Sequence, residues 1–104
     1  MVLSKKRPPP LSKNDALEMS KKFLESGNVT FTKHLSVRMK ERNFGMGDIF
    51  SVIENGVICK EPEWNGDRGE DNYFIEGKDI EEDDLTLRIA ISTNEDLLTI
   101  ITGY

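Results

Sequence analysis

Residues 31–45 contain the single histidine of the chain and several evenly spaced basic residues. His34, Arg38 and Arg42 lie four residues apart, which places them in one stripe along an α-helix. Metal-independent RNA cleavage needs a base near the 2′-hydroxyl and cations around the phosphate. We interpret His34 as that base and Arg38 and Arg42 as phosphate ligands. The alternative is a solvated helix face, because charged stripes on helices are common.

Five further side chains could bind the substrate of such a site. Lys33 adds positive charge beside the histidine, and Arg88 interrupts an apolar strand, where it either pairs with an acid or points into a site. Trp64 either stacks on a base or folds its loop back on a sheet edge. Tyr73 and Tyr104 could each supply a phenol as donor, although packing in the core or at an edge is the more frequent role of tyrosine in strands.

The acidic residues and the lone cysteine offer weaker signals. The spacing of the acids between Glu63 and Asp84 does not fit an EF-hand loop, so we predict no metal and no cofactor. These acids could instead shield the basic stripe until a partner or substrate displaces them. Cys59 has no second cysteine to pair with, and we expect it to pack as a small apolar residue.

Composition limits the classes of protein to which the chain can belong. A length of 104 residues fits one domain with a modest core. No apolar run approaches the roughly 20 residues of a membrane helix, and the start lacks the apolar segment of a secretory signal, so a cytoplasmic location is expected. Residues 1–60 hold 11 Lys or Arg and 6 Asp or Glu, whereas residues 61–104 hold 3 and 13. A basic face for RNA therefore remains available despite a net charge of −5.

Three helices are expected in the first half of the chain. Residues 1–10, basic and then proline-rich, form a flexible tail. Ser12 begins a helix over residues 13–26, which Gly27 ends. After an extended link at residues 28–31, Thr32 begins the helix of the basic stripe, over residues 33–43, which ends by Gly45. The segment GDIFSVIENG predicts a third helix with Ile49, Phe50 and Ile53 towards the core.

Strands are expected in the second half. Apolar runs begin at residue 57 and extend over residues 73–75, 85–91 and 97–101, with turn residues between them. Short connections favour an antiparallel meander. Residues 11–104 should therefore form a single α+β domain, with N-terminal helices packed on one face of a small antiparallel β-sheet.

The segments TKHLSVRMKERNF and DIFSVIENGVI resemble the signature of a small bacterial family, the domain of unknown function 4258. The resemblance covers residues 31–104, and the closing LLTIITGY resembles the last strand of that family. The matching positions are Thr32, His34, Arg38, Met39, Glu41, Arg42, Ile53 and Gly56. The family is similar in predicted architecture to the RelE/ParE and BrnT toxins. Residues 13–32 also resemble the opening of the motility quorum-sensing regulator toxin.

These resemblances imply a RelE-like toxin of a bacterial toxin–antitoxin pair. Such a protein would cleave mRNA as a metal-independent endoribonuclease and would be held in check by a cognate antitoxin protein. The alternative function, from a different class, is a noncatalytic module that uses the basic stripe or the acidic loops to dock a protein partner.

Overall fold

The α+β class is confirmed by a computed structural model, which describes residues 7–104. Along the chain the helices precede the strands, except for one short strand between the first two helices. The elements are α1 (Lys13–Ser26), β1 (Val29–Phe31), α2 (Lys33–Arg42), α3 (Met46–Asn55), β2 (Glu63–Asn65), β3 (Glu70–Lys78), β4 (Asp84–Ser92) and β5 (Leu97–Gly103). No helix within these described residues is long and apolar enough to cross a membrane.

The helix ends follow local capping chemistry. The Ser12 and Thr32 hydroxyls each accept a backbone N–H of the first helical turn, at 3.1 Å. Gly27 ends α1 in the left-handed conformation, with φ of 78°. Asn43, also left-handed, ends α2, so Gly45 does not end this helix as expected; it is the N-cap of α3. Asparagine can replace glycine at a helix end because its short polar side chain tolerates positive φ.

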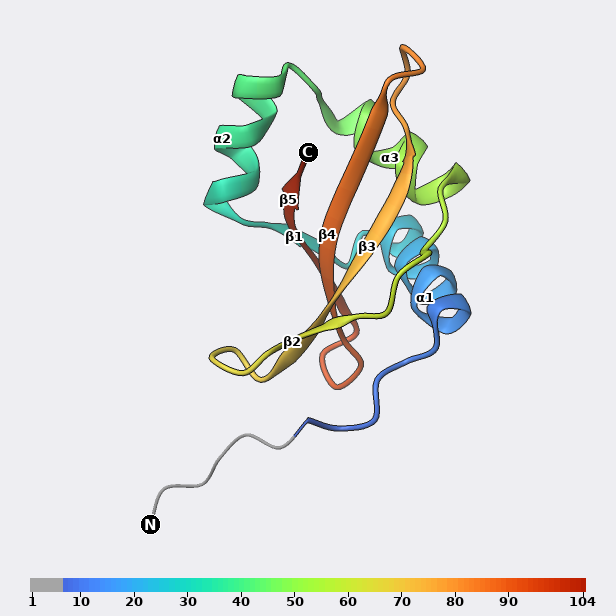
Figure 1. Cartoon of the computed structure of the whole chain (residues 1–104), viewed down its shortest axis with the longest axis vertical. Helices are drawn as coiled ribbons and strands as arrows, with labels where there is room; N and C mark the ends of the chain where they lie inside the picture. Colours follow the sequence, from blue (N-terminus) through green and yellow to red (C-terminus); the bar gives the residue numbers. More distant parts are fainter. Residues whose placement is uncertain (1–6) are drawn as a thin grey trace.

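The sheet is mixed, with strand order β1-β5-β4-β3-β2 (Figure 1). As expected, antiparallel pairs connect β3 to β4 and β4 to β5. A third antiparallel pair connects β3 to β2, a strand that was not predicted. In addition, β1 pairs parallel with β5, because the intervening α2, α3 and strands supply the long connection that a parallel pair needs. The strand expected from residue 57 is reduced to one bridge, between Val57 and Glu76. The chain soon reaches Pro62, which lacks the N–H of a continuing ladder.

One face of the sheet, called the covered face below, packs against α1 and α3 (Figure 1). It consists of alternate strand residues that are almost fully buried, such as Ile75, Leu87 and Ile100. Ile49 and Ile53 of α3 join this core as expected, whereas Phe50 is 45% exposed. Phe50 follows directly after Ile49 on a helix of 3.6 residues per turn, so it lies away from the face that contacts the sheet.

Within residues 7–104, the opposite face of the sheet, called the open face below, lacks such a cover. Strand alternation places Asn72, Phe74, Arg88 and Thr102 there, and the last three are neighbours across β3, β4 and β5. In contrast with the expected single helical layer, α2 packs apart from α1 and α3, against β5 (Figure 1).

Two apolar residues fix α2 in this separate position. Leu35 is fully buried, and Phe44, just after the helix, joins the core. Gly103 allows this approach, because a Cβ atom there would lie 2.7 Å from the Phe44 ring. His34 and Arg42 of the basic stripe remain exposed on this helix.

The segment before α1 is attached to the sheet. Residues 1–6 of the expected tail lie outside the described residues, whereas Arg7 forms an ion pair of 2.8 Å with Asp71 of β3. The Tyr73 hydroxyl accepts the Leu11 N–H at 2.8 Å and donates to the Leu11 carbonyl at 3.3 Å. Residues 7–11 are thus fixed at both ends to one strand.

Candidate active site

A cleft of about 350 Å³ opens over the open face. Its floor is formed by β3, β4 and β5, one wall by the start of α2, and the other wall by the β2–β3 hairpin. The cleft brings together His34 and Arg88, which are 54 positions apart in the chain. Arg68 of the hairpin turn and Asn72 of β3 also line it. A base candidate and two guanidinium groups therefore share one cavity.

The position of His34 follows from the junction between β1 and α2. Thr32 donates its backbone N–H to the Ile100 carbonyl at 3.2 Å and its hydroxyl to the Ile101 carbonyl at 2.6 Å. These two bonds hold the start of α2 on β5, so the second residue of the helix reaches the cleft. The His34 side chain is exposed, and within residues 7–104 it has no hydrogen-bond or ion-pair partner. Its imidazole is free to contact a ligand.

Three neighbouring side chains hold Arg88 in place. Its Nε donates to the Asn72 Oδ1 atom at 2.9 Å, and Asn72 is only 1% exposed. The guanidinium lies over the Phe74 ring at 5.4 Å, and one of its terminal nitrogens is 4.0 Å from Glu63. Arg88 therefore combines both roles that its sequence position allowed: it pairs with an acid and also lines a cavity. Few guanidinium rotamers remain, so little entropy is lost when an anion binds.

Two basic residues of this face escaped the sequence analysis. Arg68 lies in the β2–β3 turn, and Lys60 lies before β2, with its Nζ atom 4.1 Å from the centre of the Phe74 ring. Detection of β2 would have indicated the place of Arg68, because hairpin pairing folds the turn towards the cleft. No pattern in the sequence indicates the position of Lys60.

Lys60 and Glu63 shift each other's titration. The hydrogen bond with Glu63 raises the pKa of Lys60, and the same bond, of 2.8 Å, lowers the pKa of Glu63. Both side chains are about half exposed, so the pair contributes little to stability. It does keep both groups charged over a wide pH range.

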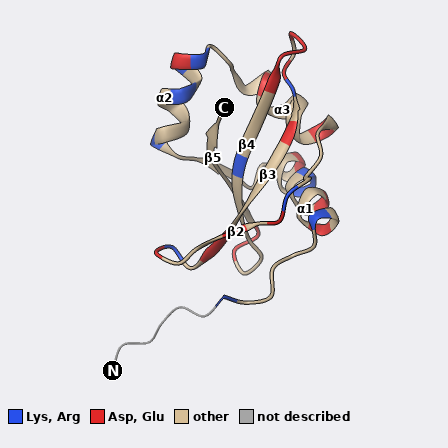
Figure 2. Ribbon diagram, viewed as in Figure 1, with Lys and Arg blue, Asp and Glu red and all other residues tan. Residues whose placement is uncertain are grey.

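The remaining basic residues of α2 lie outside the cleft lining. Lys33 and Arg42 are exposed on the helix surface. Arg38 is partly buried: its Nε donates to the Gly103 carbonyl at 3.5 Å, and its guanidinium is 3.6 Å from Glu41. Figure 2 marks Lys and Arg positions along the α2 ribbon, so positive charge continues from the cleft over this helix.

The three aromatic candidates are dispersed. Trp64 pairs with Asp71 at the edge of the sheet, which supports the interpretation that it folds its loop back on that edge. Tyr73 is 3% exposed on the covered face, and burial raises its pKa. Tyr104 is 45% exposed and pairs through its backbone with Thr86. None of the three lines the cleft as the structure describes it.

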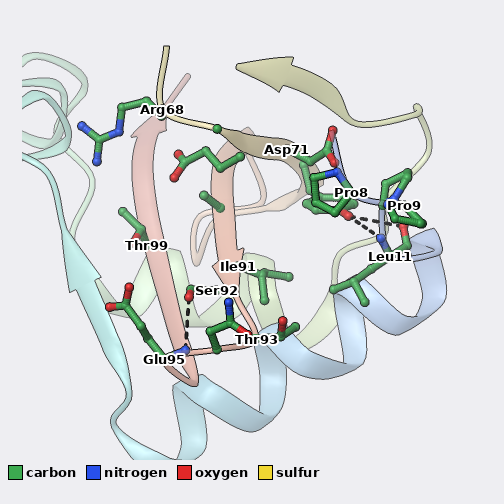
Figure 3. Close-up of a pocket in the computed structure, with 16 residues that line it drawn as sticks. Pro8, Pro9, Leu11, Arg68, Asp71, Ile91, Ser92, Thr93, Glu95 and Thr99 are labelled. Carbon is green, nitrogen blue, oxygen red and sulfur yellow. Dashed lines mark hydrogen bonds between the residues drawn. The ribbon is translucent and has the colours of Figure 1, made fainter. Parts of the chain in front are cut away.

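A second cavity, of about 390 Å³, lies at the end of the sheet (Figure 3). The two cavities share Arg68, Glu70 and Thr99. Figure 3 shows Arg68 at one side of this cavity and Pro8 beside Asp71 at the other. The two cavities are therefore neighbours at this end of the sheet.

The acidic residues form turns rather than one cluster. Asp79 accepts the backbone N–H groups of Glu81 and Asp83 at 2.9 Å, and this closes the β3–β4 turn, which is acidic in Figure 2. Within residues 7–104, no three His, Cys, Asp or Glu side chains are grouped as metal ligands. Cys59 is exposed, in contrast with the packing expected for it, because it follows the single bridge of Val57 instead of lying in a strand.

Comparisons with known proteins bear on residues 31–104. No curated protein matches the chain. One family model does match, over residues 31–104, from the last residue of β1 through β5, and it therefore includes His34, Asn72 and Arg88. This match covers well over half of the chain, so the protein belongs to the family described as "Domain of unknown function (DUF4258)".

Proposed function

We propose that the protein is a toxin-like, metal-independent endoribonuclease that cleaves mRNA in the cleft between α2 and the β2–β3 hairpin. The observation that carries this proposal is the presence of His34 and Arg88 in one cavity. A base for the 2′-hydroxyl and a fixed cation for the phosphate are the minimum that such cleavage requires. Arg68 supplies a second cation from the opposite wall.

The reaction follows from these groups. His34 takes the proton of the 2′-hydroxyl, and the 2′-oxygen attacks the adjacent phosphorus. The bond from phosphorus to the 5′-oxygen breaks, and this oxygen takes a proton from solvent, which reaches the exposed cleft. The products are a 2′,3′-cyclic phosphate and a 5′-hydroxyl. Arg88 and Arg68 stabilise the phosphate while its negative charge increases.

Residues beside the cleft extend the proposed substrate site. Lys33, Arg38 and Arg42 present positive charge along α2 to the phosphates of a longer RNA. We also propose a RelE-like architecture and function, a cytoplasmic location and a cognate antitoxin that covers the cleft.

Purified protein incubated with a 5′-labelled RNA in the presence of EDTA tests this function. We expect cleavage with a 2′,3′-cyclic phosphate end, and no cleavage at a site that carries a 2′-O-methyl group. His34→Ala should lower the rate by about 10²-fold or more, the usual contribution of a general base. Lys22→Ala, an exposed change on α1, is the matched control and should cleave at the wild-type rate.

Induced expression in a bacterial host gives the second measurement. Growth arrest and mRNA loss with the wild type, but not with His34→Ala at equal soluble level, would support the proposal. Intact RNA and normal growth with every variant would contradict it, and a noncatalytic protein-binding module would then be the better interpretation.

A further inference from the structure

Beside the cleft, two cations meet at one carboxylate. One oxygen of Glu63 lies 2.8 Å from the Lys60 ammonium, and the other lies 4.0 Å from a terminal nitrogen of Arg88. Both cations also lie over the ring of Phe74, at 4.1 and 5.4 Å from its centre. Four segments thus converge here: the link before β2, β2 itself, β3 and β4.

The arrangement has the composition of a phosphate site. A point charge from lysine and a planar guanidinium from arginine together match the oxygens of a phosphodiester. Phe74 is only 3% exposed and forms an apolar wall under both cations, which limits their hydration on that side. Arg88 also lines the cleft with His34, so the two sites share this guanidinium.

The carboxylate at this position is easily displaced. Glu63 and Lys60 are each about half exposed, and exposed ion pairs contribute little to stability. At 4.0 Å, the contact between Glu63 and Arg88 is too long for a hydrogen bond. The strong bond of Arg88 is the one to Asn72, which would persist if Glu63 moved away.

We propose that Lys60 and Arg88 form a second phosphate subsite for single-stranded RNA, and that Glu63 occupies this subsite until RNA displaces it. The inference rests on the proposed function, because that function makes RNA the polyanion in the cleft. A strand that binds here places one phosphate beside His34 and another between Lys60 and Arg88. Glu63 is then an internal competitor of the substrate.

Binding of a fluorescent 2′-O-methyl ribonucleotide nonamer, which cannot be cleaved, tests the subsite by anisotropy at several salt concentrations. Glu63→Gln should bind about 3–10-fold more tightly, with a salt dependence steeper by about one phosphate contact. Glu61→Gln is the matched control, because it removes the same charge two positions away, where Glu61 pairs with Lys13. Adding Lys60→Met to Glu63→Gln should cancel the gain, and Lys60→Arg should keep it.

A second probe separates the subsite from the proposed function. Inorganic phosphate is titrated into ¹⁵N-labelled protein, and the Arg88 Nε resonance is followed. Equal RNA affinities for Glu63→Gln, Glu61→Gln and the wild type would overturn the subsite and leave the proposed function intact. No RNA binding by any variant, with an Arg88 shift only in Glu63→Gln, would support an anion subsite and overturn the RNA function. No RNA binding and no shift would overturn both.

Discussion

The two faces of the same sheet differ in what they bury. On the covered face, Ile75, Leu87 and Ile89 are fully buried and belong to the hydrophobic core. On the open face, their strand neighbours include Asn72 and Arg88, which bond to each other. Alternate side chains of each strand point to opposite faces of the sheet. One set of side chains can therefore keep the fold stable while the other set forms a site. Stability and binding should therefore be separable by mutation.

The largest loss of stability should come from Leu87→Ala, on the covered face. This change removes buried methyl groups and leaves a cavity in the covered face, which should lower the free energy of unfolding by about 2–5 kcal/mol. Thr86→Ala, one position earlier and on the open face, should cost less than about 1 kcal/mol. Urea denaturation of both variants measures the contrast. Similar losses at the two positions would show that the faces contribute equally to stability.

A smaller loss of stability is expected from a mutation on the open face. Arg88→Met leaves the buried Asn72 Oδ1 atom without its hydrogen-bond donor, which should cost about 1–3 kcal/mol of unfolding free energy. Adding Asn72→Leu removes the unpaired polar group, so most of this loss should be recovered. RNA affinity should stay low in both variants, because the guanidinium is absent.

The double variant also distinguishes a role of Arg88 in folding stability from a role in RNA binding. If Asn72→Leu restored RNA affinity together with stability, Arg88 would act on the fold and would not be a ligand of phosphate. If neither property recovered, the Asn72–Arg88 bond would not be the main reason for the stability loss.

The sequence predicted much of the scaffold but little of the grouping of residues around the cleft. Local signals are strong for α1 and α2, because caps such as Ser12 and Thr32 act within one turn. The strict alternation around Arg88 likewise predicted β4 and its two faces. The parallel pairing of β1 with β5 depends on contacts between residues about 70 positions apart, for which three residues of strand carry no signal.

The same limit applies to the candidate site. His34 was found as the single histidine on a basic helix, and Arg88 as a charge in an apolar strand. Their presence in one cleft depends on the bond from Thr32 to Ile101, which no spacing reveals. Lys60 and Arg68 lie in connections whose paths follow from tertiary packing. Spacing alone could not show that Arg38 and Arg42, unlike His34, lie outside the cleft lining.

The smallest expected effect concerns a polar group of the covered face. Tyr73→Phe removes the hydroxyl that both accepts from and donates to Leu11, and it should cost about 1 kcal/mol of unfolding free energy. The variant should also release the segment before α1, and faster amide exchange at Leu11 would report this release. Unchanged exchange would show that the Arg7–Asp71 ion pair alone holds the segment.

The pH dependence of stability gives a second test of Tyr73. Burial raises the pKa of Tyr73 above its ordinary value of 10.0, so the folded state holds the phenol proton more tightly than the unfolded state. This contribution is fully present below pH 10.0 and is lost as the pH rises through the higher folded pKa. The melting temperature of the wild type should therefore fall more steeply above pH 10.0 than that of Tyr73→Phe. Parallel curves would contradict this assignment.

The place of β5 in the sheet also constrains the order of events during protein synthesis. Within the described sheet, β1 pairs with β5 and with no other strand, although about 65 residues separate the end of β1 from the start of β5. On the ribosome, β1 therefore has no strand partner until residues 97–103 have left the exit tunnel. Because Thr32 bonds the start of α2 to β5, the wall of the cleft that carries His34 is completed only then. A nascent chain that lacks β5 thus cannot form the cleft.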